Sequence, residues 1–501
     1  MEYIEKLYRF YLTKKQVDKL TIIRNIILEK QLSLDKICET INKSLYQVKI
    51  LINEIAEDMR EFTTFDESIF LLKKRTVYLS RELNEEQSLH IFVNLKKKYF
   101  LESPYYRLLS YLLRKRKTRM VDISEELIFS ISYCYKLISY LKKMLVIQNV
   151  PITINNNTDS IDLTGAEPCV RMYHYLVEIM ACNVYINQRT RASVELAAKE
   201  YEPLKTTKVK HDIMFSIIEN AVLRGYIVNE LDEASIAIYE QIKQLNGEKQ
   251  VIKLLPIRSQ QDIEKEQIFY HFWVFLFIPE TISDQEKLLL GKQLRNLSGN
   301  PLVEFSADVV AVLSQKYDVS KAIEAFLTYE LVMNTWGCLH LFLDSFVSTE
   351  DLSSTNERVL EVEELIATVL ERHSFVIEKE ALFLRKIAQI TASYLPIQKE
   401  EPIRIGISLL NHPEYIPVIK NKLLKIYNEN VIHFSSNLGD SDILVSDGVL
   451  IHNESQKFTF FGNVHSTKDW HNLHVMIQSM ISNKYTWKRE RNALFFCLTI
   501  R

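Results

Sequence analysis

Two stretches near the amino terminus combine hydroxyl, amide and ammonium side chains at spacings that suit one face of a helix. The first stretch offers Ser44, Tyr46, Gln47, Lys49 and Asn53. The second offers Ser132, Tyr133, Tyr135, Lys136, Ser139, Lys142 and Lys143. Such groups donate to, or accept from, base edges and phosphate oxygens. We therefore expect both stretches to bind a nucleic acid.

Basic side chains gather at two further places in the same region. Five cations lie within six residues: Arg114, Lys115, Arg116, Lys117 and Arg119. A predicted hairpin turn holds Lys73, Lys74 and Arg75. Residues 1–170 contain 27 Lys and Arg against 22 Asp and Glu, a net charge of +5, whereas the remaining residues contain 35 against 42. This asymmetry favours phosphate contacts at the amino-terminal end, although the cluster alone is also typical of a solvated linker.

An internal repeat explains how these side chains are positioned. Residues 37–44 and 123–130 both follow the pattern I-x-E-x-(I/L)-x-x-S, and they lie 86 residues apart. Beyond each copy, apolar residues recur at helical spacing, which predicts a buried stripe on a second, longer helix. Ser44 and Ser130 stand where that second helix begins, and a serine oxygen there can cap the helix. The repeat therefore predicts two copies of a helix-turn-helix.

Flanking segments extend each copy to a winged helix-turn-helix. A helix precedes each one, at Lys15 to Leu28 and at Pro104 to Lys115. Hairpins follow at Ser68 to Leu72 with Thr76 to Ser80, and at Pro151 to Ile154 with Ser160 to Leu163. In such motifs the second helix presents its N-terminal half to the major groove of duplex DNA.

The sequence argues against enzymatic, metal-binding and membrane functions. No two of its ten glycines lie within six residues of each other, which excludes a dinucleotide or phosphate-binding glycine loop. No C-x-x-C or catalytic signature occurs, and His465, His471 and His474 lack acidic or thiol partners at ligand spacing. No signal peptide opens the chain, and its most apolar run is too short to span a membrane. We expect a soluble cytoplasmic protein, not an enzyme, with no cofactor and no metal.

The two repeats, together with Leu163-Thr164-Gly165-Ala166-Glu167-Pro168-Cys169-Val170-Arg171, resemble the Mga/AtxA family of virulence transcription regulators. The resemblance implies a mainly α-helical chain of five domains. These are winged helix-turn-helix domains at 1–82 and 83–166, helical regulatory domains of the phosphotransferase-system type (PRD) at 167–282 and 283–398, and a small α/β domain like an EIIB component at 399–501.

The middle of the chain is compatible with helical regulatory domains. Amphipathic helices are predicted at Lys208 to Leu223, Glu264 to Phe277, Ser320 to Met333 and Asn356 to Glu371. The resemblance implies histidine phosphorylation in this region. The candidates are His211 and His373, followed by His271 and His340, and for each of them a structural histidine is the alternative.

From Ile403 onward, strands and helices alternate, which predicts a small parallel-sheet domain. Strands are expected at Ile403 to Ser408, Val431 to Phe434, Ile443 to Ser446 and Phe458 to Phe461, with helices at Pro413 to Tyr427 and Trp470 to Ser482. EIIB enzymes have a phosphorylated cysteine just after the first strand. Here Ser408-Leu409-Leu410 occupies that place. A structural or dimerising role is therefore favoured over phosphoryl relay.

Together these features predict a transcription regulator that binds double-stranded DNA. We expect it to form a homodimer through its C-terminal domain and to bind phosphocarrier proteins of the phosphotransferase system. Two alternatives stay open: a PRD-containing, RNA-binding antiterminator and a component of the phosphotransferase system itself.

Overall fold

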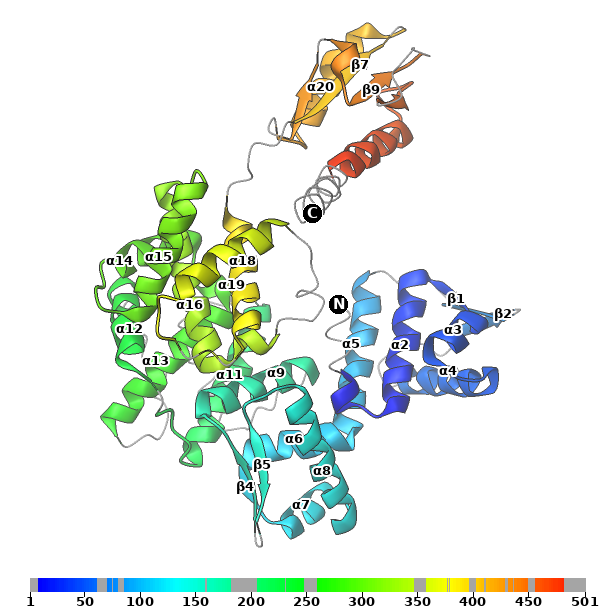
Figure 1. Cartoon of the computed structure of the whole chain (residues 1–501). Helices are drawn as coiled ribbons and strands as arrows, with labels where there is room; N and C mark the ends of the chain where they lie inside the picture. Colours follow the sequence, from blue (N-terminus) through cyan, green and yellow to red (C-terminus); the bar gives the residue numbers. More distant parts are fainter. Residues whose placement is uncertain are drawn as a thin grey trace, which may run out of the picture. The chain divides into compact units, whose positions relative to one another are not determined.

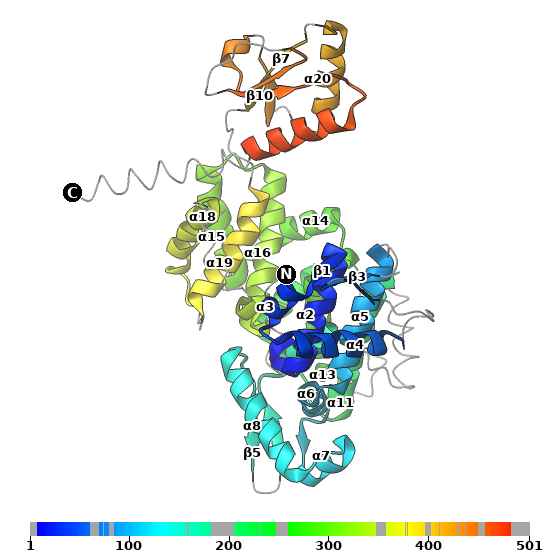
Figure 2. The ribbon, with the colours of Figure 1, turned by 90° about the vertical axis from the view of Figure 1, so that its right-hand side faces the viewer.

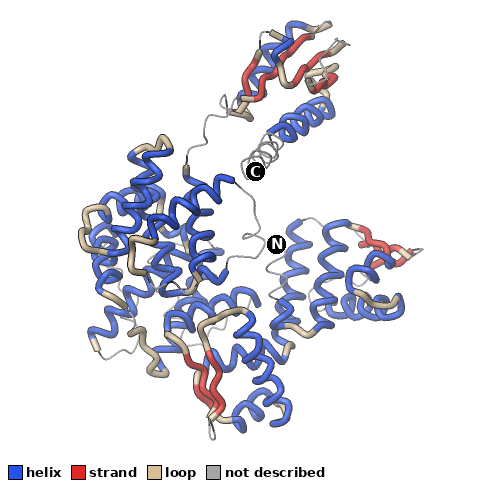
Figure 3. The backbone as a smooth tube through the Cα atoms, in the orientation of Figure 1, coloured by secondary structure: helices blue, strands red, loops and turns tan. Residues whose placement is uncertain are grey.

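The computed structural model describes residues 8–60, 70–73, 75–79, 85–157, 160–181, 205–229, 231–246, 259–346, 357–375, 377, 379–395, 402–409, 411–428, 431–435, 437–448 and 456–481. It is mostly helical, with strands in three small sheets (Figures 1 and 3). The chain divides into two compact units. One comprises Met1–Gln315 with Ser320–Tyr394, and the other comprises Lys316–Val319 with Leu395–Arg501.

The first unit begins with a small helical segment closed by a three-stranded sheet. Its elements are α2 (Lys14–Glu29), β1 (Gln31–Ser33), α3 (Leu34–Ile41), α4 (Leu45–Arg60), β2 (Phe70–Lys73) and β3 (Thr76–Leu79). The sheet is antiparallel in the order β1-β3-β2. Thr13 and Ser33 cap α2 and α3 by accepting from backbone amides. We call this the first motif.

The same order of elements returns in what we call the second motif. It consists of α6 (Pro104–Lys115), β4 (Lys117–Thr118), α7 (Met120–Leu127), α8 (Ile131–Ile147), β5 (Thr153–Asn156) and β6 (Ile161–Thr164). Its sheet has the matching order β4-β6-β5. The predicted helices and hairpins are thus present in both copies, each with a short additional strand that periodicity did not indicate.

Two details of the predicted hairpins need correction. Asn155 and Asn156 lie in β5 rather than in the turn, because they pair with Asp162 and Ile161 across the ladder. Lys73 ends β2 instead of opening the turn. Ser68, Lys74, Ser80 and the turn residues Thr158 and Asp159 lie outside the described residues.

Helix α5 (Glu85–Glu102) joins the two motifs and packs against α2 and α4 of the first (Figure 2). Its buried Tyr99 donates its hydroxyl to Asp58 of α4 (2.7 Å), while Phe100 contacts Tyr106 of α6 with ring centroids 5.5 Å apart. The first motif therefore buries one side of its three-helix core against α5, and this leaves the other side of α4 uncovered.

A helical region completes the first unit. Its helices are α9 (Glu167–Ala181), α11 (Lys205–Leu223), α12 (Glu233–Asn246), α13 (Gln260–Phe277), η2 (Pro279–Thr281), α14 (Asp284–Leu294), α15 (Pro301–Lys316), α16 (Lys321–Leu341), η3 (Leu343–Phe346), α18 (Glu357–Leu370) and α19 (Glu380–Tyr394). Helix α16 runs eight residues beyond the predicted end at Met333, because Trp336 is buried and stacks on Phe272 of α13 at 4.2 Å between ring centroids.

The second unit is a four-stranded parallel sheet with helices, as predicted. It contains β7 (Ile403–Ser408), η4 (Pro413–Tyr415), α20 (Ile416–Leu424), β8 (Ile432–Phe434), η5 (Leu438–Asp440), β9 (Ile443–Ser446), β10 (Lys457–Phe460) and a helix over 467–481. The strand order is β10-β9-β7-β8, with every pair parallel. The helix expected at Pro413 to Tyr427 is shorter, and it opens with a 3-10 turn at its proline.

No helix within the described ranges has both the length and the apolar character that crossing a membrane requires. The five domain boundaries expected from the sequence stay predictions.

Candidate nucleic-acid interface

Helix α4 separates its apolar and polar residues cleanly. Its buried stripe is Val48, Leu51, Ile52, Ile55 and Met59. All five predicted contact residues, Ser44, Tyr46, Gln47, Lys49 and Asn53, are exposed on the other side. Tyr46 is 74% exposed although its ring is largely apolar. A large exposed aromatic side chain beside a lysine and an asparagine suits contact with a partner.

The start of α4 is fixed by a reciprocal cap. The backbone amide of Gln47 donates to Ser44 Oγ (3.4 Å), and the backbone amide of Ser44 donates to Gln47 Oε1 (3.1 Å). Two orphan amides of the first turn are thereby satisfied. The cap predicted at Ser44 is present, and it holds the first turn of α4 where the polar face begins.

Helix α8 repeats this arrangement in the second motif. Ser130 caps it by accepting from the amide of Tyr133 (3.3 Å). Its buried stripe is Cys134, Leu137, Ile138, Leu141, Met144 and Leu145. Of the predicted contact residues, Lys142 is half-buried, and the exposed ones are Ser132, Tyr133, Tyr135, Lys136, Ser139 and Lys143. Both outer faces are therefore open within the first unit.

The turn between α7 and α8 has a feature that the repeat did not indicate. Ile128 adopts a left-handed conformation (φ 58°) and is 87% exposed. The equivalent residue of the first motif is Asn42, with φ 50°. A β-branched residue is strained in this conformation, whereas asparagine tolerates it. The sequence pattern of the repeat does not specify backbone angles, so it could not have identified the strain at Ile128.

The basic cluster 114–119 differs from its prediction, because ion pairs within the motif hold most of it. Lys115 lies 3.2 Å from Glu126, Lys117 lies 3.9 Å from Asp162 and Arg119 lies 2.7 Å from Asp122. The Arg114 side chain donates to the carbonyl of Ser110 (3.2 Å). Lys117 and Arg119 are therefore on the surface, but each already has a carboxylate of the motif beside it.

Arg116 requires a correction. Its side chain is 2% exposed and pairs with Glu167 at 3.2 Å, so it is a buried structural cation and cannot contact phosphate in this conformation. Burial lowers the pKa of Arg116 to about 10. The arginine ends α6 with φ 63°, which turns its side chain inward toward α9.

In the first wing, Arg75 occupies the turn with φ 70°, and its exposed side chain lies 3.8 Å from Asp35. Lys73 is the last residue of β2. Contact of this wing with DNA through Lys73, Lys74 and Arg75 stays a prediction.

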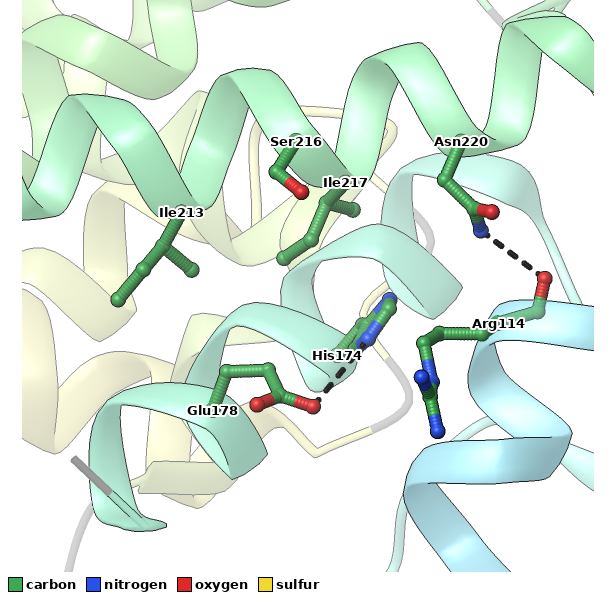
Figure 4. Close-up of a pocket in the computed structure, with 7 residues that line it drawn as sticks. All are labelled: Arg114, His174, Glu178, Ile213, Ser216, Ile217 and Asn220. Atoms are coloured by element: carbon green, nitrogen blue, oxygen red, sulfur yellow. Dashed lines mark hydrogen bonds and ion pairs between the residues drawn. The ribbon is translucent and has the colours of Figure 1, made fainter. Parts of the chain in front are cut away.

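Helix α9 joins the second motif to the helical region through buried charges. Arg171 Nε donates to Glu167 Oε1 (2.8 Å), and Arg171 Nη2 donates to Glu266 Oε1 of α13 (2.8 Å). Further along α9, His174 Nε2 lies 3.5 Å from Glu178 Oε1, beside a cavity of about 20 Å³ (Figure 4). Across that cavity, Asn220 of α11 donates to the carbonyl of Arg114 (2.9 Å).

Tyrosine hydroxyls join the segment before α2 to α8 and to α9. Tyr11 is buried, and its hydroxyl lies 3.0 Å from both Gln148 Oε1 and the hydroxyl of Tyr173. The hydroxyl of Tyr140 on α8 donates to the carbonyl of Phe10 (3.2 Å). These contacts join residues more than 120 positions apart, so periodicity alone could not have predicted them.

The candidate phosphorylation histidines differ in access. His211 and His271 are buried. Nδ1 of His211 lies 3.0 Å from Tyr270 Oη, and Nδ1 of His271 lies 2.7 Å from the carbonyl oxygen of Gln267. A phosphoryl donor therefore cannot reach either ring without opening the fold, which corrects the preference for His211. The side chain of His373 is 12% exposed and that of His340 15%, with Asp308 and Asp232 respectively beside them.

Among the described residues of the second unit, the C-terminal histidines and the end of β7 form no group that could hold a metal ion. His474 Nδ1 lies 3.1 Å from the hydroxyl of Tyr427. In the described ranges, no group of three His, Cys, Asp or Glu side chains is placed to hold a metal ion. Strand β7 ends at Ser408, and this is the strand after which the phosphorylated cysteine of an EIIB enzyme would be expected.

Comparison with known families bears on the second motif. Residues 87–177, from α5 into α9, match the family model described as the Mga helix-turn-helix domain. No curated protein matches the chain. The family match confirms the resemblance to regulators of the Mga/AtxA type and indicates a DNA-binding transcription regulator.

Proposed function

We propose that this chain regulates transcription by binding duplex promoter DNA, with α4 and α8 as two recognition helices. The observation that supports this proposal most strongly is the pairing of a buried apolar stripe with a largely exposed polar face on both helices. In helix-turn-helix proteins that face enters the major groove. The family match places one of the two helices inside a Mga helix-turn-helix domain.

The side chains divide by the contacts they suit. Asn53 and Ser139 have donors and acceptors for base edges. Lys49, Lys136 and Lys143 suit phosphate oxygens, which fix the register of the protein on the duplex. We expect salt-dependent binding with a smaller contribution from base contacts.

Duplex DNA is favoured over the two alternatives by the shape of the motifs. The major groove of A-form RNA is too narrow for a helix, so the exposed faces of α4 and α8 do not suit an RNA hairpin. A phosphotransferase component would need a phosphoryl-accepting cysteine after β7, and Ser408-Leu409 stands there.

Selection from a random duplex library tests the function directly. The full chain should enrich one sequence, and fluorescence anisotropy should then show binding to that duplex and not to hairpin RNA. Replacing Tyr135, Lys136 and Ser139 together by alanine should weaken binding roughly 10- to 100-fold, as expected for losing contacts worth 1–3 kcal/mol. Lys292→Ala on α14, an exposed charge far along the chain, is the control. Preference for hairpin RNA would refute the proposal.

Histidine phosphorylation is part of the proposal, at His373 first and His340 second, because these rings reach the surface while His211 and His271 do not. Incubation with phosphohistidine donors of the phosphotransferase system should label the folded protein at His373. The label should disappear in His373→Ala. Labelling confined to His211 or His271 would contradict this assignment.

The last part of the proposal is that the chain self-associates through the second unit. β10 is an edge strand, and it exposes Phe460 (59%) next to Val475 of the following helix. Exposed apolar edges favour pairing with another chain. Sedimentation should show a dimer that Phe460→Glu dissociates, while Lys468→Glu, at another exposed position, should leave it intact.

A further inference from the structure

We propose that the cleft between the two motifs holds one sugar–phosphate strand of the bound duplex, with Arg9 and Lys14 as phosphate contacts. This inference rests on the proposed DNA-binding function and assigns to it a surface that lies outside both recognition helices. It adds phosphate contacts to those proposed for Lys49, Lys136 and Lys143, and it takes the place that sequence analysis predicted for the cluster 114–119.

The cleft is a concave space of about 650 Å³ within the first unit. Helix α2 and the end of α3 line one side. Phe92 of α5, Tyr105 of α6 and Tyr140 of α8 line the other. The rings of Tyr105 and Tyr140 pack together with centroids 4.3 Å apart, which gives this side a firm wall. The volume is that of a small-ligand site, so it accommodates a short length of one strand rather than a whole duplex.

The charges that line the cleft are mainly positive. Arg9, Lys14 and Arg24 contribute cations, and Asp18 is the acidic residue on its wall. Asp18 is already paired with Lys43 at 3.3 Å, so its charge is largely offset. A cleft lined by one sign of charge concentrates its field and attracts an opposite charge.

Arg9 and Lys14 differ from the cations of the cluster in being available. Both are exposed, and among the residues that the structure describes neither forms an ion pair. In contrast, Lys115, Lys117 and Arg119 each have a carboxylate nearby. A phosphate that meets Arg9 or Lys14 therefore replaces water and counterions, whereas one that meets the cluster must compete with a carboxylate.

The position of the cleft links it to DNA. Asn42, on its rim, lies in the turn that leads into α4, and Tyr140 lies on α8 itself. The cleft thus borders α8 and the turn that precedes α4. A strand that follows the groove from one helix toward the other passes the cations of the cleft.

The experiment compares salt dependence of binding to the selected duplex. Full-length wild type, Arg9→Ala/Lys14→Ala and Lys117→Ala/Arg119→Ala are titrated between about 50 and 200 mM KCl. Each lost phosphate contact lowers the slope of log K against log salt by about 1, so the cleft variant should lose about 2 and the cluster variant much less. The Arg9 backbone carbonyl that faces Tyr140 survives in the alanine variant, and unchanged unfolding midpoints verify the fold.

The possible outcomes distinguish a failure of the cleft proposal from a failure of the proposed DNA-binding function. An unchanged slope in the cleft variant, with wild type binding the duplex, would overturn the cleft alone. Equal losses in both double variants would also overturn it, because total charge would then explain the effect. Stabilisation of DNA-free protein by inorganic pyrophosphate, without a change in DNA slope, would reassign the cleft to a free anion. Failure of wild type to bind any duplex would instead remove the proposed function.

Discussion

Ile128 and Asn42 occupy equivalent turns, yet only one of them suits its backbone. Both residues have a left-handed φ, and this conformation costs a β-branched side chain roughly 1–2 kcal/mol. Because Ile128 is 87% exposed, little packing offsets that cost. The second motif therefore retains local strain at a position where the first has none.

Exchanging the two residues should have opposite effects on stability. Ile128→Asn should raise the free energy of unfolding by about 1 kcal/mol, and Asn42→Ile should lower it by about the same amount. Urea denaturation followed by circular dichroism measures both changes. Shifts of the same sign, or no shift in either variant, would show that the turn conformation is not the cause.

His174 makes stability depend on pH. Burial lowers its pKa below the ordinary value of 6.5, although the hydrogen bond and charge of Glu178 oppose that effect. Below pH 6.5 the unfolded chain binds a proton that the folded ring does not accept. Stability is therefore full above pH 6.5 and falls as the pH decreases toward the folded pKa.

This linkage predicts that the free energy of unfolding falls as the pH decreases below 6.5, with His174 contributing at most about 1.4 kcal/mol per pH unit. His340 and His474, whose pKa values burial also lowers, add to the total. His174→Gln should reduce the loss, while His90→Gln, an exposed position on α5, should not. Denaturation curves at several pH values measure it. Parallel pH profiles for wild type and His174→Gln would refute the role of His174.

At the scale of elements, apolar periodicity was sufficient for the long helices. It predicted α6 with its N-terminal Pro104 and α8 with its serine cap, because both depend on residues within a few positions. The strands β1 and β4 have three and two residues and no detectable period. Their existence depends on pairing with the wings, which is a tertiary contact.

The same distinction explains the error at Arg116. Its burial depends on Glu167, 51 residues away, and no local pattern distinguishes a buried arginine from its exposed neighbours. The exposed faces of α4 and α8 were predictable because they lie opposite local apolar stripes. The cleft was not predictable, since five separate helices contribute to its walls.

The junction between α9 and α13 leads to a prediction about stability. Arg171 neutralises both Glu167 and Glu266, which are buried. Arg171→Met should leave Glu266 without a cation and cost about 3–5 kcal/mol. Arg119, which pairs with Asp122 at the surface, offers the comparison, since Arg119→Met should leave the stability nearly unchanged. Thermal unfolding measures both, and equal small losses would contradict the structural role of Arg171.

At the scale of the whole first unit, tyrosine contacts join the segment before α2 to α8 and α9, and we expect them to hold the two proposed recognition helices at a fixed distance. Tyr11 bonds to Gln148 and Tyr173, and Tyr140 bonds to the backbone of the first motif. If both helices bind one duplex, a fixed separation raises the effective concentration of the second helix once the first is bound.

Tyr11→Phe/Tyr140→Phe should therefore weaken binding to the full selected duplex several-fold while leaving binding to a half-length duplex unchanged. Anisotropy with the two lengths of DNA measures the difference. Tyr239→Phe in the helical region controls for a general loss of a buried hydroxyl. Equal weakening on both duplexes would indicate damage to one motif rather than loss of coupling.

The most direct test of the central claim is photocrosslinking from the two proposed recognition helices to the selected duplex. A photoreactive residue at Tyr46 or Tyr135 should crosslink to DNA bases, because both side chains are exposed on the outer faces of α4 and α8. The same residue at Leu89, exposed on α5, should not. Binding that yields crosslinks only from Leu89, or none from either tyrosine position, would contradict the account.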